Sequence, residues 1–232
     1  MEAQEKIITG VCETHGEYES KAQEIMGRTF ATGCPECEAE REAKQKADDE
    51  KRLRAARERR VEELAQGALI PKRFQGYGFD DYQPANDKAA KIKAACQRYA
   101  ERFEDRLQMG GGLVLCGKPG TGKTHLACAI ANHVMREFFR VPLFTSVTKM
   151  SRAVKATYTP KSDRTEAQVI RSFVDPDLLI LDEVGAQRGT ETELLLAQEI
   201  IDERYQEVRP TILISNLPES ELGRYIGDRA ID

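Results

Sequence analysis

The stretch LVLCGKPGTGKTHLACAI, residues 113–130, constrains the fold of this chain more than any other. Its centre, GKPGTGKT at 117–124, satisfies the pattern G-x-x-x-x-G-K-[ST] in full and stands between an apolar run and a segment with helical spacing. Strand, glycine-rich turn and helix in this order predict a loop whose backbone N–H groups face phosphates at the positive end of a helix dipole. A glycine-rich turn that merely joins strand to helix explains a full match in this context poorly.

The loop residues divide into those with an individual role and those that only line the phosphates. Gly117, Gly120 and Gly122 allow backbone conformations that a Cβ would forbid. Lys123 is expected to reach the β and γ phosphates of ATP, and the Thr124 hydroxyl is expected to ligate Mg²⁺. The other predicted nucleotide-binding residues, without an individual role, are Lys118, Pro119, Thr121 and His125.

Two later segments carry the polar groups that hydrolysis of a bound triphosphate requires. DLLILDEVG is an apolar strand that ends in Asp182 and Glu183. We expect Asp182, at the carboxyl end of the strand beside the loop, to bind Mg²⁺, and Glu183 to orient or deprotonate the attacking water. The strand TILISN ends in Asn216, whose amide either hydrogen-bonds the γ phosphate or the water, or caps a turn before Pro218.

Apolar strands alternate with helices along this half of the chain, which predicts an α/β fold with a parallel sheet covered on both faces. The expected strands are 112–116, 142–147, 177–182 and 210–215. The expected helices are 86–108, 123–140, 149–158, 164–173 and 191–207.

The front of the chain has a different pattern, in which CETH and CPEC form one C-x₂-H and one C-x₂-C pair. Two short-spaced ligand pairs presented on turns suit tetrahedral Zn²⁺, and a segment this small does not fold on an apolar core alone. The predicted zinc ligands, a closed and therefore structural set, are Cys12, His15, Cys34 and Cys37. Incidental thiols are the alternative, and the segment 1–37 resembles a zinc ribbon.

Residues 38–66 are nearly all good helix formers with a thin apolar stripe, so we expect a charged helix with little to bury. It is either a solvated spacer or a docking helix whose basic run at 51–60 is available to phosphates. The lead-in segment 69–84 follows, with Phe74, Tyr77, Phe79 and Tyr82 expected to pack onto the next domain rather than stack on bases. We therefore expect the chain to consist of three parts, residues 1–37, 38–68 and 69–232.

Charge and apolar patterning exclude several classes of protein. A net charge of −4 argues against a chain that coats nucleic acid over its whole surface. No apolar run approaches the length of a spanning helix and the first residues lack a secretory pattern, so we expect a cytoplasmic protein with no membrane partner. Clustered cysteines at the front and others inside apolar elements favour metal ligands and buried thiols over disulfides.

With these motifs the chain resembles the AAA+ superfamily, whose nucleotide loop, acidic strand and first sensor correspond to GKPGTGKT, LLILDE and the strand ending in Asn216. Within it, residues 69–232 are similar to bacterial and phage replicative helicase loaders of the DnaC type. The matching text is IPKRFQGYGFDDY, CGKPGTGKTHLACAIANHVM, DLLILDEVGAQRGTETELLLAQEIIDERY and LISNLPESELGRYIGDRAID. The resemblance implies an ATPase that binds the hexameric helicase and helps to place it on single-stranded DNA.

The resemblance also implies a pair of DNA-facing helices at about 149–172, with an ordinary solvated face as the alternative. Their basic residues are Lys149, Arg152, Lys155, Lys161, Arg164 and Arg171. In these loaders an arginine acts on the ATP of a neighbouring copy, which implies self-association through the ATPase domain. Arg229 is the candidate in this sequence, unless that arginine lies beyond Asp232.

Two other functions compete with the loader. An ATP-binding transposition helper of the insertion-sequence type has a similar fold, shares the text GKTHLA and acts on target DNA. A non-hydrolysing switch, in which ATP only orders a surface, is the third hypothesis, and Glu183 speaks against it. The separate front module and the text LDEVG favour the loader.

Overall fold

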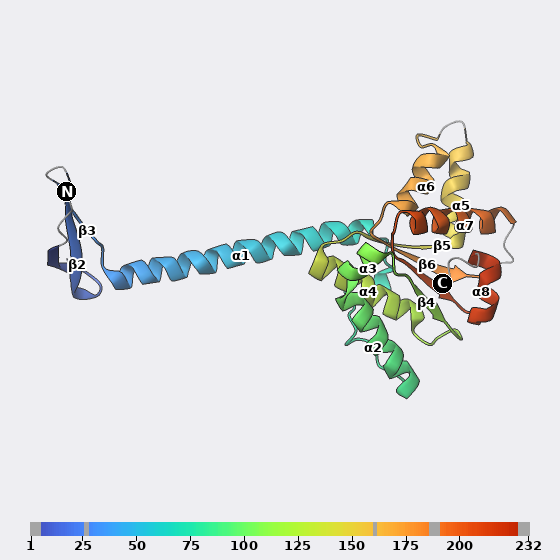
Figure 1. Ribbon diagram of the computed structural model, residues 1–232, viewed down its shortest axis with the longest axis horizontal. Helices are drawn as coiled ribbons and strands as arrows, with labels where there is room; N and C mark the ends of the chain where they lie inside the picture. Colours follow the sequence, from blue (N-terminus) through green and yellow to red (C-terminus); the bar gives the residue numbers. More distant parts are fainter. Residues whose placement is uncertain (1–5, 26–27, 160–161, 186–190, 227–232) are drawn as a thin grey trace. The chain divides into compact units, whose positions relative to one another are not determined.

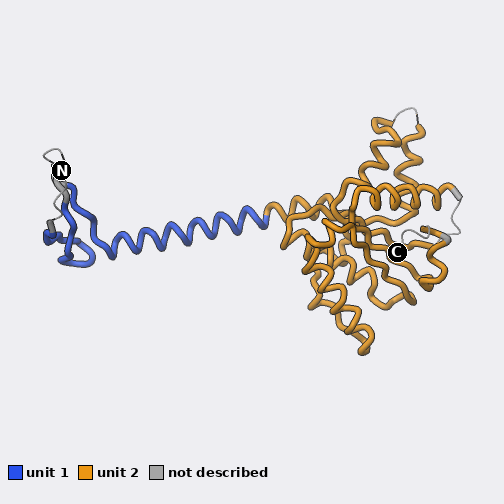
Figure 2. Tube along the Cα trace, in the orientation of Figure 1, with its two compact units in different colours: residues 1–58 blue, residues 59–232 orange. Residues whose placement is uncertain are grey.

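The computed structural model describes residues 6–25, 28–159, 162–185 and 191–226. The chain divides into two compact units, residues 1–58 and 59–232 (Figure 2). In the described ranges no helix has both the length and the apolar character needed to cross a membrane.

The front unit is built on a small antiparallel sheet in the order β1-β2-β3. Its strands are β1 (Lys6–Cys12), β2 (Gly16–Ile25) and β3 (Arg28–Ala31) (Figure 1). Cys12 pairs with Gly16 at the end of the β1–β2 ladder, so the turn between them carries His15. After β3, the Ser20 hydroxyl donates to the Thr32 carbonyl at 2.7 Å and holds the chain against β2. This sheet therefore positions the first ligand pair directly.

Helix α1 spans Pro35–Gly67, and it includes the helix expected at 38–66. It begins earlier because proline suits the first helical position, so Cys37 lies on the first turn of a helix and not on a free turn as we expected. Along most of its length α1 is exposed, and ion pairs such as Arg54–Glu58 at 3.0 Å support it. Near its end, Leu64 is buried in the apolar core of the second unit.

The second unit is a three-layer α/β structure around a parallel sheet, as the sequence predicts. The strands are β4 (Leu113–Cys116), β5 (Pro142–Ser146), β6 (Leu178–Val184) and β7 (Thr211–Ser215). Their order is β4-β7-β6-β5, so β7 and not the acidic strand β6 lies directly beside β4. The strand that carries Asp182 is therefore separated from the strand before the loop by β7.

Alternate residues of each strand enter two separate apolar cores. Leu178 and Ile180 face the core that holds the helices α2 (Asp87–Glu101), α3 (Phe103–Met109) and α4 (Lys123–Phe138). Leu179 and Leu181 face the other core. Its helices are α5 (Val147–Lys155), α6 (Glu166–Val174), α7 (Glu191–Gln206) and α8 (Glu219–Ile226). Strands buried on both faces explain why the sequence shows continuous apolar runs and no alternation.

Several element boundaries differ from those expected. The helix expected at 86–108 is two helices, because Arg102 has a non-helical backbone (φ −105°, ψ 29°) and Phe103 starts α3 fully buried. The helix expected at 149–158 starts at Val147, capped by Ser146, and ends in the 3₁₀ turn η2 (Ala156–Tyr158). A second 3₁₀ turn, η1 (Lys72–Phe74), lies in the lead-in segment. Helix α8 has only eight residues, and the sequence pattern does not predict it.

A buried arginine on α7 ties together the chain before β6 and before β7. Arg204 is 0% exposed, and burial lowers its pKa to about 9. Its guanidinium donates five hydrogen bonds of 2.6–3.1 Å to the carbonyls of Phe173, Val174, Pro176 and Pro210 and to the Thr211 hydroxyl. No carboxylate contributes to these bonds, so Arg204 acts as a multivalent hydrogen-bond donor to the last carbonyls of α6 and to the chain that leads into β6 and β7.

Replacing Arg204 by Met is expected to lower the free energy of unfolding by about 3 kcal/mol or more, because the buried carbonyls lose their donors. Urea unfolding followed by circular dichroism measures this change. Arg171→Met is the matched control, since Arg171 makes an exposed ion pair with Glu207, and we expect it to cost less than about 1 kcal/mol. Equal stability of the two variants would contradict the role of Arg204.

Candidate functional site

The loop 117–124 connects β4 to α4, and its glycines adopt backbone conformations that favour glycine. The φ angles are 146° at Gly117, 79° at Gly120 and 83° at Gly122, all in the region that L side chains rarely adopt. Helix α4 begins at Lys123, so the N–H groups of its first turn open toward the loop. The local sequence thus builds a backbone cradle at a helix N-terminus, an arrangement that binds anions.

Lys123 lies at the centre of this cradle. Its Nζ donates to the carbonyls of Gly117 at 2.7 Å and Lys118 at 3.0 Å, and to Asn216 Oδ1 at 2.9 Å. Burial lowers the pKa of Lys123, and the nearby Asp182 carboxylate opposes that shift. Asn216 is brought to the loop by β7, so the side chain does more than cap a turn before Pro218.

A second contact joins the loop to the acidic strand. The Thr124 hydroxyl donates to Asp182 Oδ2 at 3.0 Å. The two residues meet although β7 lies between β4, which leads into the loop, and β6, which carries Asp182. The other carboxylate oxygen, Asp182 Oδ1, accepts from the Glu183 N–H at 2.7 Å. Hydroxyl and carboxylate oxygens are the ligands that Mg²⁺ takes in proteins, so this pair fits that ion chemically.

Glu183 stands next to this pair in an unusual conformation. Its φ is 60°, and the register between β6 and β7 shifts between Leu181 and Val184, which marks a bulge. A bulge turns one side chain out of the regular alternation of a strand. Glu183 is exposed at the end of the sheet where the loop lies. A strained backbone conformation costs stability, and such conformations are concentrated at functional sites.

A cavity of about 860 Å³ continues from the loop along α2. Loop residues from Gly117 to Lys123 form one wall, and Ala89, Ile92 and Cys96 of α2 form another. Its apolar lining and size suit a nucleoside beside the phosphate cradle. Sequence reasoning missed the α2 residues, because an amphipathic helix gives no signal of which cavity its face borders.

The lead-in segment packs against the start of α4, as expected. Phe79 and Tyr82 are buried in the core that contains α4. His125 lies among the rings of Phe74, Tyr77 and Tyr82, with centroid distances of 5.5, 5.4 and 5.5 Å. His125, to which the motif assigns no role, therefore anchors this segment beside the loop.

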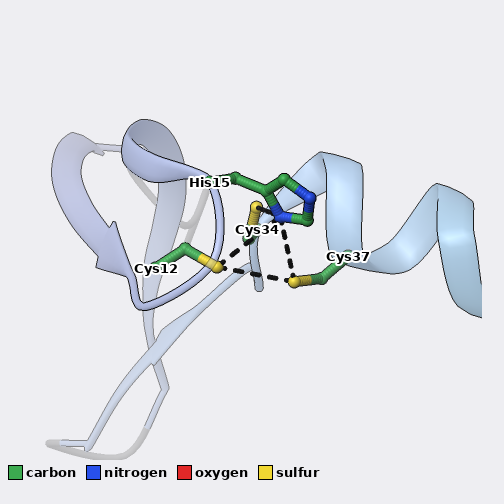
Figure 3. Close-up of side chains that lie close together, drawn as sticks. All are labelled: Cys12, His15, Cys34 and Cys37. Carbon is green, nitrogen blue, oxygen red and sulfur yellow. Dashed lines mark hydrogen bonds between the residues drawn. The ribbon is translucent and has the colours of Figure 1, made fainter.

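In the front unit, four side chains converge from two places in the sequence (Figure 3). Cys12 and His15 come from the end of β1 and the following turn, Cys34 directly precedes α1, and Cys37 lies on its first turn. Their ligand atoms all lie within 4.8 Å of one another. The Cys12–Cys37 sulfur distance is 3.5 Å, and His15 Nδ1 lies 3.7, 3.6 and 3.3 Å from the sulfurs of Cys12, Cys34 and Cys37.

These distances match the edges of a zinc tetrahedron, which are about 3.8 Å between sulfurs and about 3.6 Å between sulfur and nitrogen for normal bond lengths. His15 Nε2 lies 3.3 Å from Glu40 Oε1, so a carboxylate orients the ring from the far side. Backbone N–H groups of His15 and Thr14 lower the pKa of Cys12 to about 6. Its thiol therefore loses its proton readily, and the thiolate is the form that binds metal.

The basic residues expected to face DNA are only partly available. Lys149, Arg152 and Arg164 are exposed on the α5–α6 pair. Lys155 lies 3.5 Å from Glu193, and Arg171 pairs with Asp175 and Glu207. Lys161 and Arg229 lie outside the described residues.

Sheet order, phosphate loop and acidic strand end together define a P-loop nucleotide-binding domain of the AAA+ class. Its fold is similar to that in the crystal structure of the DnaC helicase loader, with a TM-score of 0.61 and 22% identity over 69% of this chain and 93% of that one. Residues 43–232 match the family described as IstB-like ATP binding protein. The chain belongs to this family.

The curated relatives include proteins named replicative helicase loader DnaC. The one from Buchnera aphidicola subsp. Acyrthosiphon pisum is 33% identical over 163 residues, which are 70% of this chain and 65% of the relative. The one from Escherichia coli strain K12 is 30% identical over 158 residues, which are 68% of this chain and 62% of the relative. The alignments thus span less than two thirds of these relatives, and they confirm the predicted resemblance to helicase loaders.

Proposed function

We propose that this protein is an ATP-hydrolysing loader of the replicative DNA helicase. The observation that carries the ATPase part is the convergence of Lys123 with Asn216 and of Thr124 with Asp182 on one loop. The loader part is supported by the names of the relatives, which are similar to this chain over about two thirds of its length.

In this proposal each side chain of the site has one task. Lys123 stabilises the β and γ phosphates, and Thr124 and Asp182 hold Mg²⁺, which when bound neutralises charge that develops on the phosphates. Glu183, turned outward by the bulge, orients or deprotonates the attacking water. Asn216 positions Lys123 and the γ phosphate through its amide. Arg229 of a second copy completes the site if the protein self-associates.

The α5–α6 pair is the proposed track for single-stranded DNA. Lys149, Arg152 and Arg164 offer exposed positive charge there, which suits contacts to phosphates. Ion pairing of Arg171 with two carboxylates removes it from the strongest candidates. DNA binding in this proposal therefore depends on the first three residues.

The transposition helper is the weaker alternative. The family description includes the IstB name, so the family by itself does not separate the two functions. The relatives named above are named helicase loaders, and the four cysteine and histidine side chains belong to a separate unit that precedes the second unit in the sequence. Both observations favour the loader, with the front unit as a docking module for the helicase or DNA.

Lys123→Ala is expected to abolish ATP binding, because Nζ of Lys123 brings the positive charge at the centre of the cradle. Glu183→Gln should bind ATP and turn over at least about 100-fold more slowly, the usual size of a general-base contribution. Binding is measured with a fluorescent ATP analogue and turnover by phosphate release, with Lys91→Ala as control, since Lys91 is exposed and does not line the cavity beside the loop. Normal turnover by Glu183→Gln would sink the assigned role.

Purified chain is expected to retain the hexameric replicative helicase of its host on an affinity column in the presence of ATP and Mg²⁺. Lys149→Gln with Arg152→Gln and Arg164→Gln should still retain the helicase but bind an oligo(dT) strand more weakly. The slope of its salt dependence should fall by about 0.7 for each phosphate that the variant no longer neutralises. If the helicase flows through while duplex DNA is bound tightly, the transposition helper replaces the loader.

Zinc is the metal we propose for the front cluster, because three thiols and one imidazole form a closed tetrahedral set. Purified protein should contain one zinc per chain, and Cys34→Ser should lose it while the buried Cys96→Ser keeps it. Retention should fall with falling pH, because protons then compete at His15, whose pKa is raised to about 9 by its bond to Cys12, and at the thiols. Elemental analysis after dialysis over a pH series tests both statements.

A further inference from the structure

Tyr82 of the lead-in segment touches the phosphate loop, although it lies well before the loop in the sequence. Its side chain is 7% exposed, and its hydroxyl donates to the backbone carbonyl of Thr121 at 3.1 Å. Thr121 is the loop residue directly before Gly122. The contact thus fixes one peptide group of the cradle from outside the motif.

That peptide group has its N–H on the opposite side. The described chain contains no cis peptide bonds, and in a trans peptide the C=O and the following N–H point in opposite directions. With the Thr121 carbonyl held by Tyr82, the Gly122 N–H must point away from the Tyr82 hydroxyl. In a phosphate loop the successive N–H groups are the ligands of the phosphates, and a peptide that flips would present a carbonyl oxygen instead.

Gly122 reveals how closely the tyrosine approaches. A Cβ at this position would lie 2.3 Å from Tyr82 Cε2 and 3.3 Å from Cζ, far inside normal contact. Its φ of 83° already favours glycine. Glycine is therefore required here twice, once for the turn and once for the ring that lies against it.

Tyr82 is itself held firmly by its neighbours. Its N–H donates to the Phe79 carbonyl at 3.1 Å, its own carbonyl accepts from Lys93 Nζ at 3.2 Å, and its ring meets His125 edge-on at 5.5 Å. Further along the segment, Asn132 Nδ2 of α4 donates to the carbonyls of Phe74 and Tyr77 at 2.9 and 2.8 Å.

These bonds hold the lead-in segment against α4, the helix that follows the loop. The position of the hydroxyl is thus set before any ligand arrives, which is the condition for a group that preorganises a binding site.

We propose that Tyr82 is a positioning residue for the triphosphate: its hydroxyl holds the Thr121–Gly122 peptide so that the Gly122 N–H faces the phosphates. The inference rests on the proposed ATP binding and adds a residue outside the loop motif to it. Tyr82 touches the loop and needs no contact with the reacting atoms. Its effect is on phosphate affinity and not on recognition of the base.

Tyr82→Phe tests this, because it removes the hydroxyl and keeps the ring against Gly122 and His125. Tyr99→Phe is the matched control, since Tyr99 is equally buried at 6% exposure and its hydroxyl donates to the Gly111 carbonyl at 2.8 Å, just before β4 and not at the loop. Calorimetric affinities are measured for ATP with Mg²⁺, for tripolyphosphate and for adenosine. Melting temperatures are recorded for both variants.

Loss of one neutral hydrogen bond typically costs about fivefold in an equilibrium constant. We expect Tyr82→Phe to weaken ATP and tripolyphosphate by about fivefold and to leave adenosine unchanged, and Tyr99→Phe to change none of the three affinities. Unchanged ATP affinity in Tyr82→Phe overturns the inference, and so does an equal loss of affinity for adenosine. A variant that simply unfolds loses affinity for adenosine as well and therefore gives the second of these results. If wild-type and Lys123→Ala proteins bind ATP alike, the proposed function fails instead.

Discussion

The parallel pairing of β4 with β7 is the interaction on which the rest of the site depends. Cys116 pairs with Ser215, and the Gly117 N–H extends the ladder by donating to the Ser215 carbonyl at 3.2 Å. Asn216 directly follows β7, so this register sets the asparagine beside the start of the loop. A register shifted by one residue would turn the side chains of β7 to the opposite faces of the sheet and remove the Lys123 contact. The burial of both sheet faces makes such a shift costly.

The two units fold for different physical reasons. The second unit has two apolar cores, one on each face of its sheet, and Arg204 donates to backbone carbonyls just before the inner strands β6 and β7. In the front unit, the side chains described as buried before α1 are only those of Ser20, Ala22 and Cys34. Such a sheet has too little apolar area to be stable alone, and in our proposal a metal held by the four converging side chains supplies the crosslink that a core would otherwise provide.

A strained residue, Glu183, and a supporting residue, Tyr82, both lie next to the loop. Glu183 is held in a left-handed conformation by the bulge of β6, while Tyr82 of the lead-in segment, packed against His125 of α4, supports the loop. Neither feature belongs to the phosphate-loop motif. The motif provides the backbone path, and the surrounding fold decides which peptide groups and side chains face the ligand.

The sequence by itself determined the elements with strong local signals. The phosphate loop, the strands around it, the charged helix and the four clustered ligands each depend on residue types at fixed short spacing, which local chemistry dictates. It did not determine that β7 lies between β4 and β6, that the helix after Asn86 breaks at Arg102, or that Glu183 sits on a bulge. Those outcomes depend on contacts between residues far apart in the chain. Only the tertiary structure decided which strands are neighbours, and with that which side chains reach Lys123 and Thr124, because burial of both faces of the sheet is a property of the whole domain.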